Sequence, residues 1–139
     1  MKLVTAEMTN RRRLPGTRDQ RLGLVIVIWT LAVWLPRIWI IPVGDLWELI
    51  RIVVSIAVGL GAAFALVRPG RYTNFLLLAF PVWSAGVWGR TLWNYWTLNN
   101  PPELRLVHTL LAIGYFYLAW RVFRTVRQRA HSVVSVAGT

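Results

Sequence analysis

Residues 46–67 read LWELIRIVVSIAVGLGAAFALV, and this stretch decides the class of fold. Its only charged side chains are Glu48 and Arg51, both close to its start. A bilayer core of roughly 30 Å is crossed by about 20 helical residues that rise about 1.5 Å each. A run of this length without further charge therefore predicts a transmembrane helix.

Three similar stretches surround it. An apolar run over residues 22–42 is interrupted at Pro36 and Arg37, and two more cover residues 73–98 and 104–120. Hydrophobic residues make up 56% of the chain and charged residues 15%, against about 25% charged residues in a typical soluble domain. Four apolar helices in 139 residues leave no polar layer to cover them, so lipid must do so. We predict an all-α membrane protein with four transmembrane helices in an antiparallel bundle.

The basic residues predict the orientation of this bundle. Twelve of the 16 Lys and Arg residues lie in the tail 1–21, the turn 68–71 and the extension 121–139. Basic segments stay cytoplasmic, so we expect both termini in the cytoplasm. The strong preference for Arg over Lys hints at a GC-rich genome, and we expect a bacterial inner membrane. The predicted division is a basic tail at 1–21, a membrane domain at 22–120, and a basic extension with a loose tail at 121–139.

Aromatic residues mark the predicted membrane interfaces. Indole rings prefer the depth of the lipid headgroups. The positions near the predicted outer helix ends are Trp34, Trp39, Trp47, Trp93, Tyr95 and Trp96, and Trp120 marks the inner end of the fourth helix.

Ionisable residues gather toward the outer side. Glu48 and Arg51 are three residues apart on one helix face and can pair. Arg90 lies about 12 Å deep if its helix ends at Leu98, but only about 4–5 Å deep if the helix ends at Trp93. We favour snorkelling arginines with one local ion pair; the alternative is a polar vestibule for a partner, an ion or a headgroup. This candidate outer polar cluster comprises Arg37, Asp45, Glu48, Arg51, Arg90, Glu103, Arg105 and His108.

Small residues four positions apart form a second feature. Such spacing lets two helix backbones approach closely in a membrane. We favour packing within one chain over a subunit interface, and both interpretations stay open. The candidate helix-packing face comprises Ser55, Gly59, Ala63, Ala85 and Gly89.

Pro36 interrupts the first stretch. Proline removes one helical hydrogen bond and either kinks or ends the helix. We favour a helix end with an aromatic anchor, with a mobile hinge as the alternative.

The basic extension after Trp120 carries Arg121, Arg124, Arg127 and Arg129, and we expect it to continue the fourth helix into the cytoplasm. Each such Arg gains roughly 1 kcal/mol near an anionic leaflet. No signature of a nucleic-acid-binding module accompanies them. We therefore expect contact with anionic lipid headgroups and none with nucleic acid.

Catalytic motifs are missing from the sequence. It has no Cys and no G-x-S-x-G, H-E-x-x-H, P-loop or dinucleotide fingerprint, and His108 and His131 are predicted on opposite sides of the membrane. We expect no enzyme activity, no metal site and no cofactor. The inner half of the 46–67 stretch also lacks polar groups, so a single chain offers no continuous conduction path.

In size and number of spans the chain resembles small four-pass proteins of bacteria and their phages, including holin-like lysis proteins and prophage exclusion proteins. The resemblance is one of build and carries no residue roles. We predict a structural or accessory protein that packs against a membrane partner or lipid, as a homo-oligomer or beside another subunit. The alternatives are a holin-like or exclusion protein that oligomerises and permeabilises the membrane, and a small transporter or channel.

Overall fold

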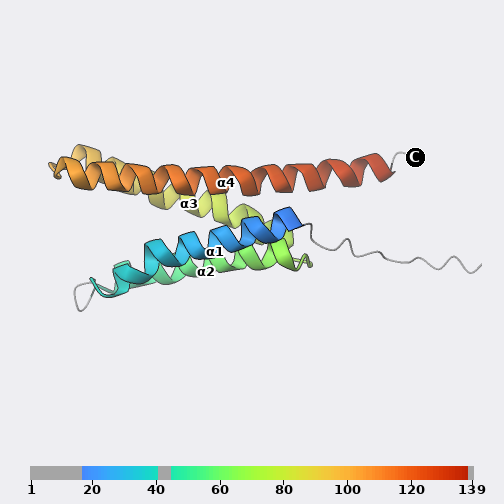
Figure 1. The fold of residues 1–139 in the computed structure, drawn as a ribbon, viewed down its shortest axis with the longest axis horizontal. Coiled ribbons are helices and arrows are strands. Elements are labelled where there is room, and N and C mark those ends of the chain that lie inside the picture. Colours follow the sequence, from blue (N-terminus) through green and yellow to red (C-terminus); the bar gives the residue numbers. More distant parts are fainter. Residues whose placement is uncertain (1–16, 41–44, 138–139) are drawn as a thin grey trace, which may run out of the picture.

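The structure, a computed structural model, describes residues 17–40 and 45–137 of the chain. Each helix in this part contains a window that is long and apolar enough to cross a membrane. The all-helical architecture and four apolar helices fit a small multi-pass membrane protein. The elements are α1 (Thr17–Ile38), α2 (Leu46–Val67), α3 (Thr73–Thr97) and α4 (Pro102–Ala137) (Figure 1).

Two helices are longer than the hydropathy pattern predicts. The pattern begins the first helix at Leu22, whereas α1 begins at Thr17. Residues 17–21 are polar but helix-forming, and Asp19 in the first turn interacts favourably with the helix dipole. At the other terminus α4 continues through the basic extension, as expected, but it reaches Ala137 and so also includes most of the predicted loose tail. The rest of that tail, most of the basic N-terminal tail and the end of the first apolar run lie outside the described residues.

Pro36 lies inside α1 and does not stop the helix, which ends two residues later at Ile38. The backbone N–H of Trp39 donates to the Pro36 carbonyl at 3.3 Å, and that of Ile40 donates to the Arg37 carbonyl at 3.0 Å. These short-range bonds close a turn directly after the helix. Pro36 therefore lies in the last helical turn, where a missing backbone hydrogen bond disrupts the fewest following residues.

Close packing joins α1 to α2, α2 to α3, and α3 to α4. Small residues bring α1 and α2 together. A Cβ atom placed on Gly59 would lie 2.5 Å from the Oγ1 atom of Thr30, and one on Gly23 would lie 3.3 Å from the carbonyl oxygen of Ala63. Any larger side chain at Gly59 would push the two helices apart.

Aromatic rings fill the centre of the bundle. Trp88 stacks on Tyr115 with ring centroids 5.1 Å apart, and Trp34 lies 6.1 Å from Trp88. Trp34 is only 1% exposed, so the expectation that it marks the outer interface is wrong. It follows Ile26 and Thr30 at intervals of four residues, and this spacing turns all three toward the core.

The outer surface is rich in large apolar side chains, which lipid can cover and water cannot. Trp39 is 89% exposed, and Trp47, Trp93, Trp96 and Trp120 are exposed as well. Tyr95 is half-buried. Except for Trp34 and Tyr95, the aromatic residues expected at the interfaces therefore lie on the surface of the bundle.

Candidate functional site

Arg37 is the centre of a connected polar group near the end of α1. Its guanidinium carbon lies 4.9 Å from the ring centroid of Trp34 and 5.8 Å from that of Trp88. Its Nη2 atom lies 3.4 Å from Nε2 of His108. One arginine thus links α1 to α3 and α4, with its charge held against aromatic rings.

The geometry around His108 defines the role of each ring nitrogen. Nδ1 lies 2.8 Å from the carbonyl oxygen of Leu104, which can only accept, so Nδ1 donates. Nε2 is then the acceptor for Arg37 in the neutral ring. Tyr95 stacks on the same ring, with centroids 3.7 Å apart. Both nitrogens are engaged and a cation lies beside the ring, which disfavours a metal ion at this histidine.

Glu48 and Arg51 form an ion pair on α2, three residues apart as their spacing predicts. The backbone N–H of Glu48 also donates to Oδ1 of Asp45 at 3.0 Å. Asp45 therefore caps the start of α2 and satisfies one of its free amide groups. The ion pair lies within electrostatic reach of Arg37.

The other three members of the candidate outer polar cluster lie apart from Arg37. Arg105 packs its guanidinium carbon 5.9 Å from the ring centroid of Trp96, and Glu103 is exposed in the first turn of α4. Arg90 is exposed on α3, and the structure shows no hydrogen bond or ion pair for it among the residues it describes. Because α3 ends at Thr97, Arg90 lies about 10–11 Å from the helix end, close to the deeper of the two predicted positions.

The structure therefore brings Arg37 to His108 and pairs Glu48 with Arg51, while Asp45 acts as a cap. Sequence reasoning missed Trp34, Trp88 and Tyr95 as the aromatic partners of this group. The only signal in the sequence was the three-residue spacing of Trp34 and Arg37, which places both side chains on one face of a helix. The contacts made by the group are within the chain and join three helices, which supports a locking role at this end of the bundle.

The α2 half of the candidate helix-packing face is buried. Ser55, Gly59 and Ala63 all face other helices. The Ser55 hydroxyl donates to the Arg51 carbonyl at 2.7 Å and accepts from Nε1 of Trp83 at 2.9 Å, which ties α2 to α3. These three residues are used inside the chain.

The α3 half is exposed. Ala85 and Gly89 lie on the surface, and a Cβ atom built on Gly89 or on the neighbouring Gly86 would meet no atom within 4 Å. Val82, one turn before, is 73% exposed, and Trp93, one turn after, is 71% exposed. We call Val82, Ala85, Gly86, Gly89 and Trp93 the α3 outer face. Sequence reasoning missed Gly86, although it follows Val82 at the same four-residue interval.

No family model, curated protein or solved structure matches the chain.

Proposed function

We propose that this chain is a small, non-catalytic four-pass protein of a bacterial inner membrane that acts by packing against another membrane-spanning helix. The observation that carries the proposal is the α3 outer face. It offers two glycines and an alanine on the surface of an apolar helix, between the large side chains of Val82 and Trp93.

Small residues on a lipid-facing helix come at a cost to the isolated chain. Glycine is about 1 kcal/mol less favourable than alanine inside a helix, and it provides no side chain for contact with lipid. Its advantage is that a second backbone can approach closely. The same advantage operates inside this protein, where Gly59 of α2 contacts Thr30 of α1. The exposed pair on α3 therefore suits a neighbouring helix.

Arg90 supports the same interpretation and suggests the chemistry of the partner. It is exposed next to Gly89, about 10–11 Å from the end of an apolar helix. A charged side chain at the centre of a membrane helix costs about 2.5–3.5 kcal/mol on insertion scales. A partner helix that carries a carboxylate or an amide oxygen at this depth would lower that cost.

The proposed topology is antiparallel, with both termini in the cytoplasm. In Figure 1 the C-terminal ends of α1 and α3 lie toward one end of the molecule, and the C-terminal ends of α2 and α4 lie toward the other. The second end carries the basic turn 68–71 and the basic part of α4. The positive-inside rule favours the cytoplasm for that end.

A photo-crosslinking amino acid at Trp93 tests the proposal. Benzoylphenylalanine is close to tryptophan in size and leaves both glycines in place. We expect one discrete adduct from position 93. The matched control is the same replacement of Trp120, an exposed tryptophan of α4, which should give no such adduct. Adding Gly89→Leu should reduce the adduct from position 93 about tenfold. Equal adducts from both positions, or an adduct insensitive to Gly89→Leu, would contradict the proposal.

The alternative function is permeabilisation of the membrane by a holin-like or exclusion oligomer. The α3 outer face is also compatible with such an oligomer, because a second copy of this chain can supply the neighbouring helix. A voltage-sensitive dye during induction separates the two, with the Gly89→Leu variant at matched expression as control. Sudden depolarisation with loss of viability, seen only with the unmodified chain, would favour the oligomer. An unchanged potential would favour docking to another subunit.

A transporter or channel remains the second alternative, and the apolar inner half of α2 counts against it.

A further inference from the structure

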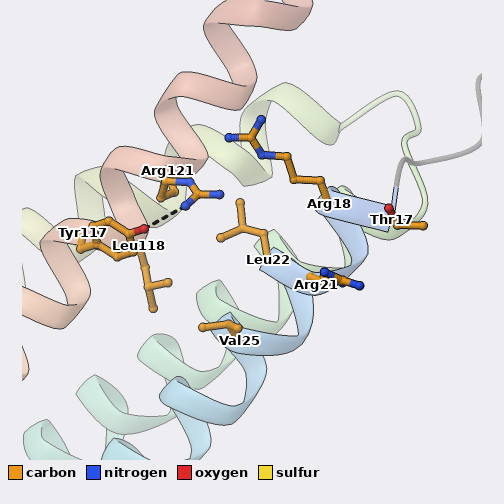
Figure 2. A pocket seen from close by; sticks show the side chains of 8 residues that line it. All are labelled: Thr17, Arg18, Arg21, Leu22, Val25, Tyr117, Leu118 and Arg121. Carbon is orange, nitrogen blue, oxygen red and sulfur yellow. Dashed lines mark hydrogen bonds between the residues drawn. The ribbon is translucent and has the colours of Figure 1, made fainter.

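A cavity of about 400 Å³ lies between α1 and α4 at the basic end of the bundle (Figure 2). This volume is within the usual range of small-ligand sites. Its polar part is formed by Arg18 and Arg21 of α1 and Arg121 of α4. Its apolar part is formed by Leu22, Val25 and Leu118.

The charge of this cavity is not balanced by the residues that line it, none of which is acidic. Arg18 and Arg21 are three residues apart on one helix, a spacing at which like charges repel. Arg121 donates to the hydroxyl of Tyr117 at 2.8 Å, which leaves its charge in place. In Figure 2 the side chains of Arg18 and Arg121 extend toward each other across the gap. These two guanidinium groups carry like charges, and an anion placed between them would offset the repulsion.

The neighbouring carboxylate is already engaged elsewhere. Asp19 follows Arg18 in α1, but its Oδ2 atom accepts from Nη2 of Arg129 at 2.9 Å. This pair joins the start of α1 to the extension of α4, beyond the cavity. The cavity therefore keeps its positive charge even though an acid lies next to it in the sequence.

Two contacts between α1 and α4 border the cavity. On one side lies the Asp19–Arg129 pair. On the other, the ring of Trp29 packs against Gly114 so closely that a Cβ atom there would lie 2.2 Å from the ring. A large ring between the two helices keeps their backbones apart at this level. The cavity between these contacts is therefore part of the fold.

The apolar lining indicates what kind of anion fits. Leu22 and Leu118 are buried at the base, whereas Val25 is 48% exposed and lies one turn deeper in the membrane than Arg21. A ligand held at the arginines would thus extend along an apolar surface toward the lipid. A free phosphate has no group to place there, whereas a phospholipid has both a phosphodiester and an acyl chain.

We infer that this cavity binds one anionic phospholipid of the cytoplasmic leaflet. The phosphodiester lies between Arg18 and Arg121, whose guanidinium groups match phosphate oxygens in geometry and charge. The side chain of Arg21 extends away from these two in Figure 2 and adds its charge from the rim of the cavity. The acyl chain follows Val25 into the bilayer. Basic pockets between transmembrane helices on the cytoplasmic side recognise anionic headgroups in this way. The inference rests on the proposed membrane orientation and is independent of the α3 outer face.

The test is a competition experiment on the full chain in non-ionic detergent. Fluorescent phosphatidylglycerol is bound, and unlabelled phosphatidylglycerol, phosphatidylcholine or inorganic phosphate is added. We expect phosphatidylglycerol to compete at least about tenfold better than the other two. Arg18→Gln/Arg121→Gln should weaken binding about tenfold or more, as expected for the loss of two charges near an anionic headgroup. The matched control is Arg68→Gln/Arg127→Gln, which removes two exposed charges outside the cavity and should change binding less than about twofold.

A second variant separates the cavity from its charge. Val25→Trp fills the apolar part and keeps every arginine, so it should also weaken phosphatidylglycerol binding about tenfold. If circular dichroism shows that the double arginine variant does not fold, Val25→Trp alone tests whether the cavity binds the lipid. Equal loss in the control variant would overturn the inference in favour of diffuse charge attraction. Equal competition by phosphatidylcholine, or by inorganic phosphate, would overturn it as well. Crosslinking at position 93 should persist in all of these variants, so failure of the lipid site is distinct from failure of helix docking.

Discussion

Single glycines determine how closely α1 approaches its neighbours. Gly59 admits the side chain of Thr30, and Gly114 admits the ring of Trp29. The two contacts have different consequences. Thr30 is small and fully buried, so α1 and α2 pack closely, whereas Trp29 is large, so α1 and α4 stay further apart and leave the basic cavity between them.

Gly59→Ala should lower the free energy of unfolding by about 1–3 kcal/mol, because its methyl group overlaps with a buried Thr30 that has little freedom to move. The measurement is unfolding in detergent, followed by circular dichroism. Gly86→Ala is the control, because a Cβ atom there meets nothing within 4 Å. It should leave stability unchanged or raise it by up to about 1 kcal/mol through helix propensity. Equal losses in the two variants would show that Gly59 is not a packing contact.

Residue-level prediction from the sequence succeeded where partners are close in the chain. The Glu48–Arg51 pair follows from helix spacing alone. The contacts of Arg37 with Trp88 and His108 do not, because they depend on how α1, α3 and α4 are rotated about their axes. Hydropathy carries no information on that rotation. Trp34 illustrates the same limit, since an indole near a helix end suits an interface and a core equally well.

At the scale of elements, α2 spans the residues that the apolar pattern predicts, Leu46–Val67, because Asp45 and the turn after Val67 end the pattern sharply. The ends of α1 and α4 were not predictable by hydropathy, because their extra turns are polar and helical at once. The length of a helix and the length of its apolar stretch are therefore separate properties. The difference matters here, because the arginines of the cavity and the Asp19–Arg129 pair lie in these extra turns.

Asp19→Asn should weaken the link between the start of α1 and the extension of α4. The ion pair is partly exposed, so we expect a loss of at most about 1 kcal/mol that shrinks as salt is added. Hydrogen exchange should show faster exchange in the first turns of α1. Glu103→Gln, at an exposed acid in the first turn of α4, should leave exchange in α1 unaltered. Equal protection of α1 in both variants would contradict a role for the pair.

At the scale of the whole molecule, the chain has one basic end and one end with mixed charge. Four apolar helices and their order along the chain follow from composition and length, which is why the membrane architecture was accessible from the sequence. The cavity was not, because its three arginines come from two helices that are about 100 residues apart in the chain.

The absence of cysteine allows a direct test of orientation. In intact cells a membrane-impermeant maleimide should label Asn99→Cys, in the turn between α3 and α4, and should not label Gly70→Cys, in the basic turn. Both positions are exposed. After permeabilisation the two variants should react equally, which serves as the control. The opposite pattern in intact cells would reverse the proposed topology.

The contacts between α1 and α4 have a consequence for biogenesis. Asp19 and Arg129 are 110 residues apart, and Arg37 and His108 are 71 residues apart. A ribosome adds about 5–20 residues each second, so Arg37 is made on the order of 4–14 s before its histidine exists. During that interval the nascent chain has no last helix to cover this side of α1, and lipid or an insertase must cover it. The arrival of α4 is therefore the closing step of assembly, and a ribosome stalled before residue 108 would leave an open three-helix intermediate in the membrane.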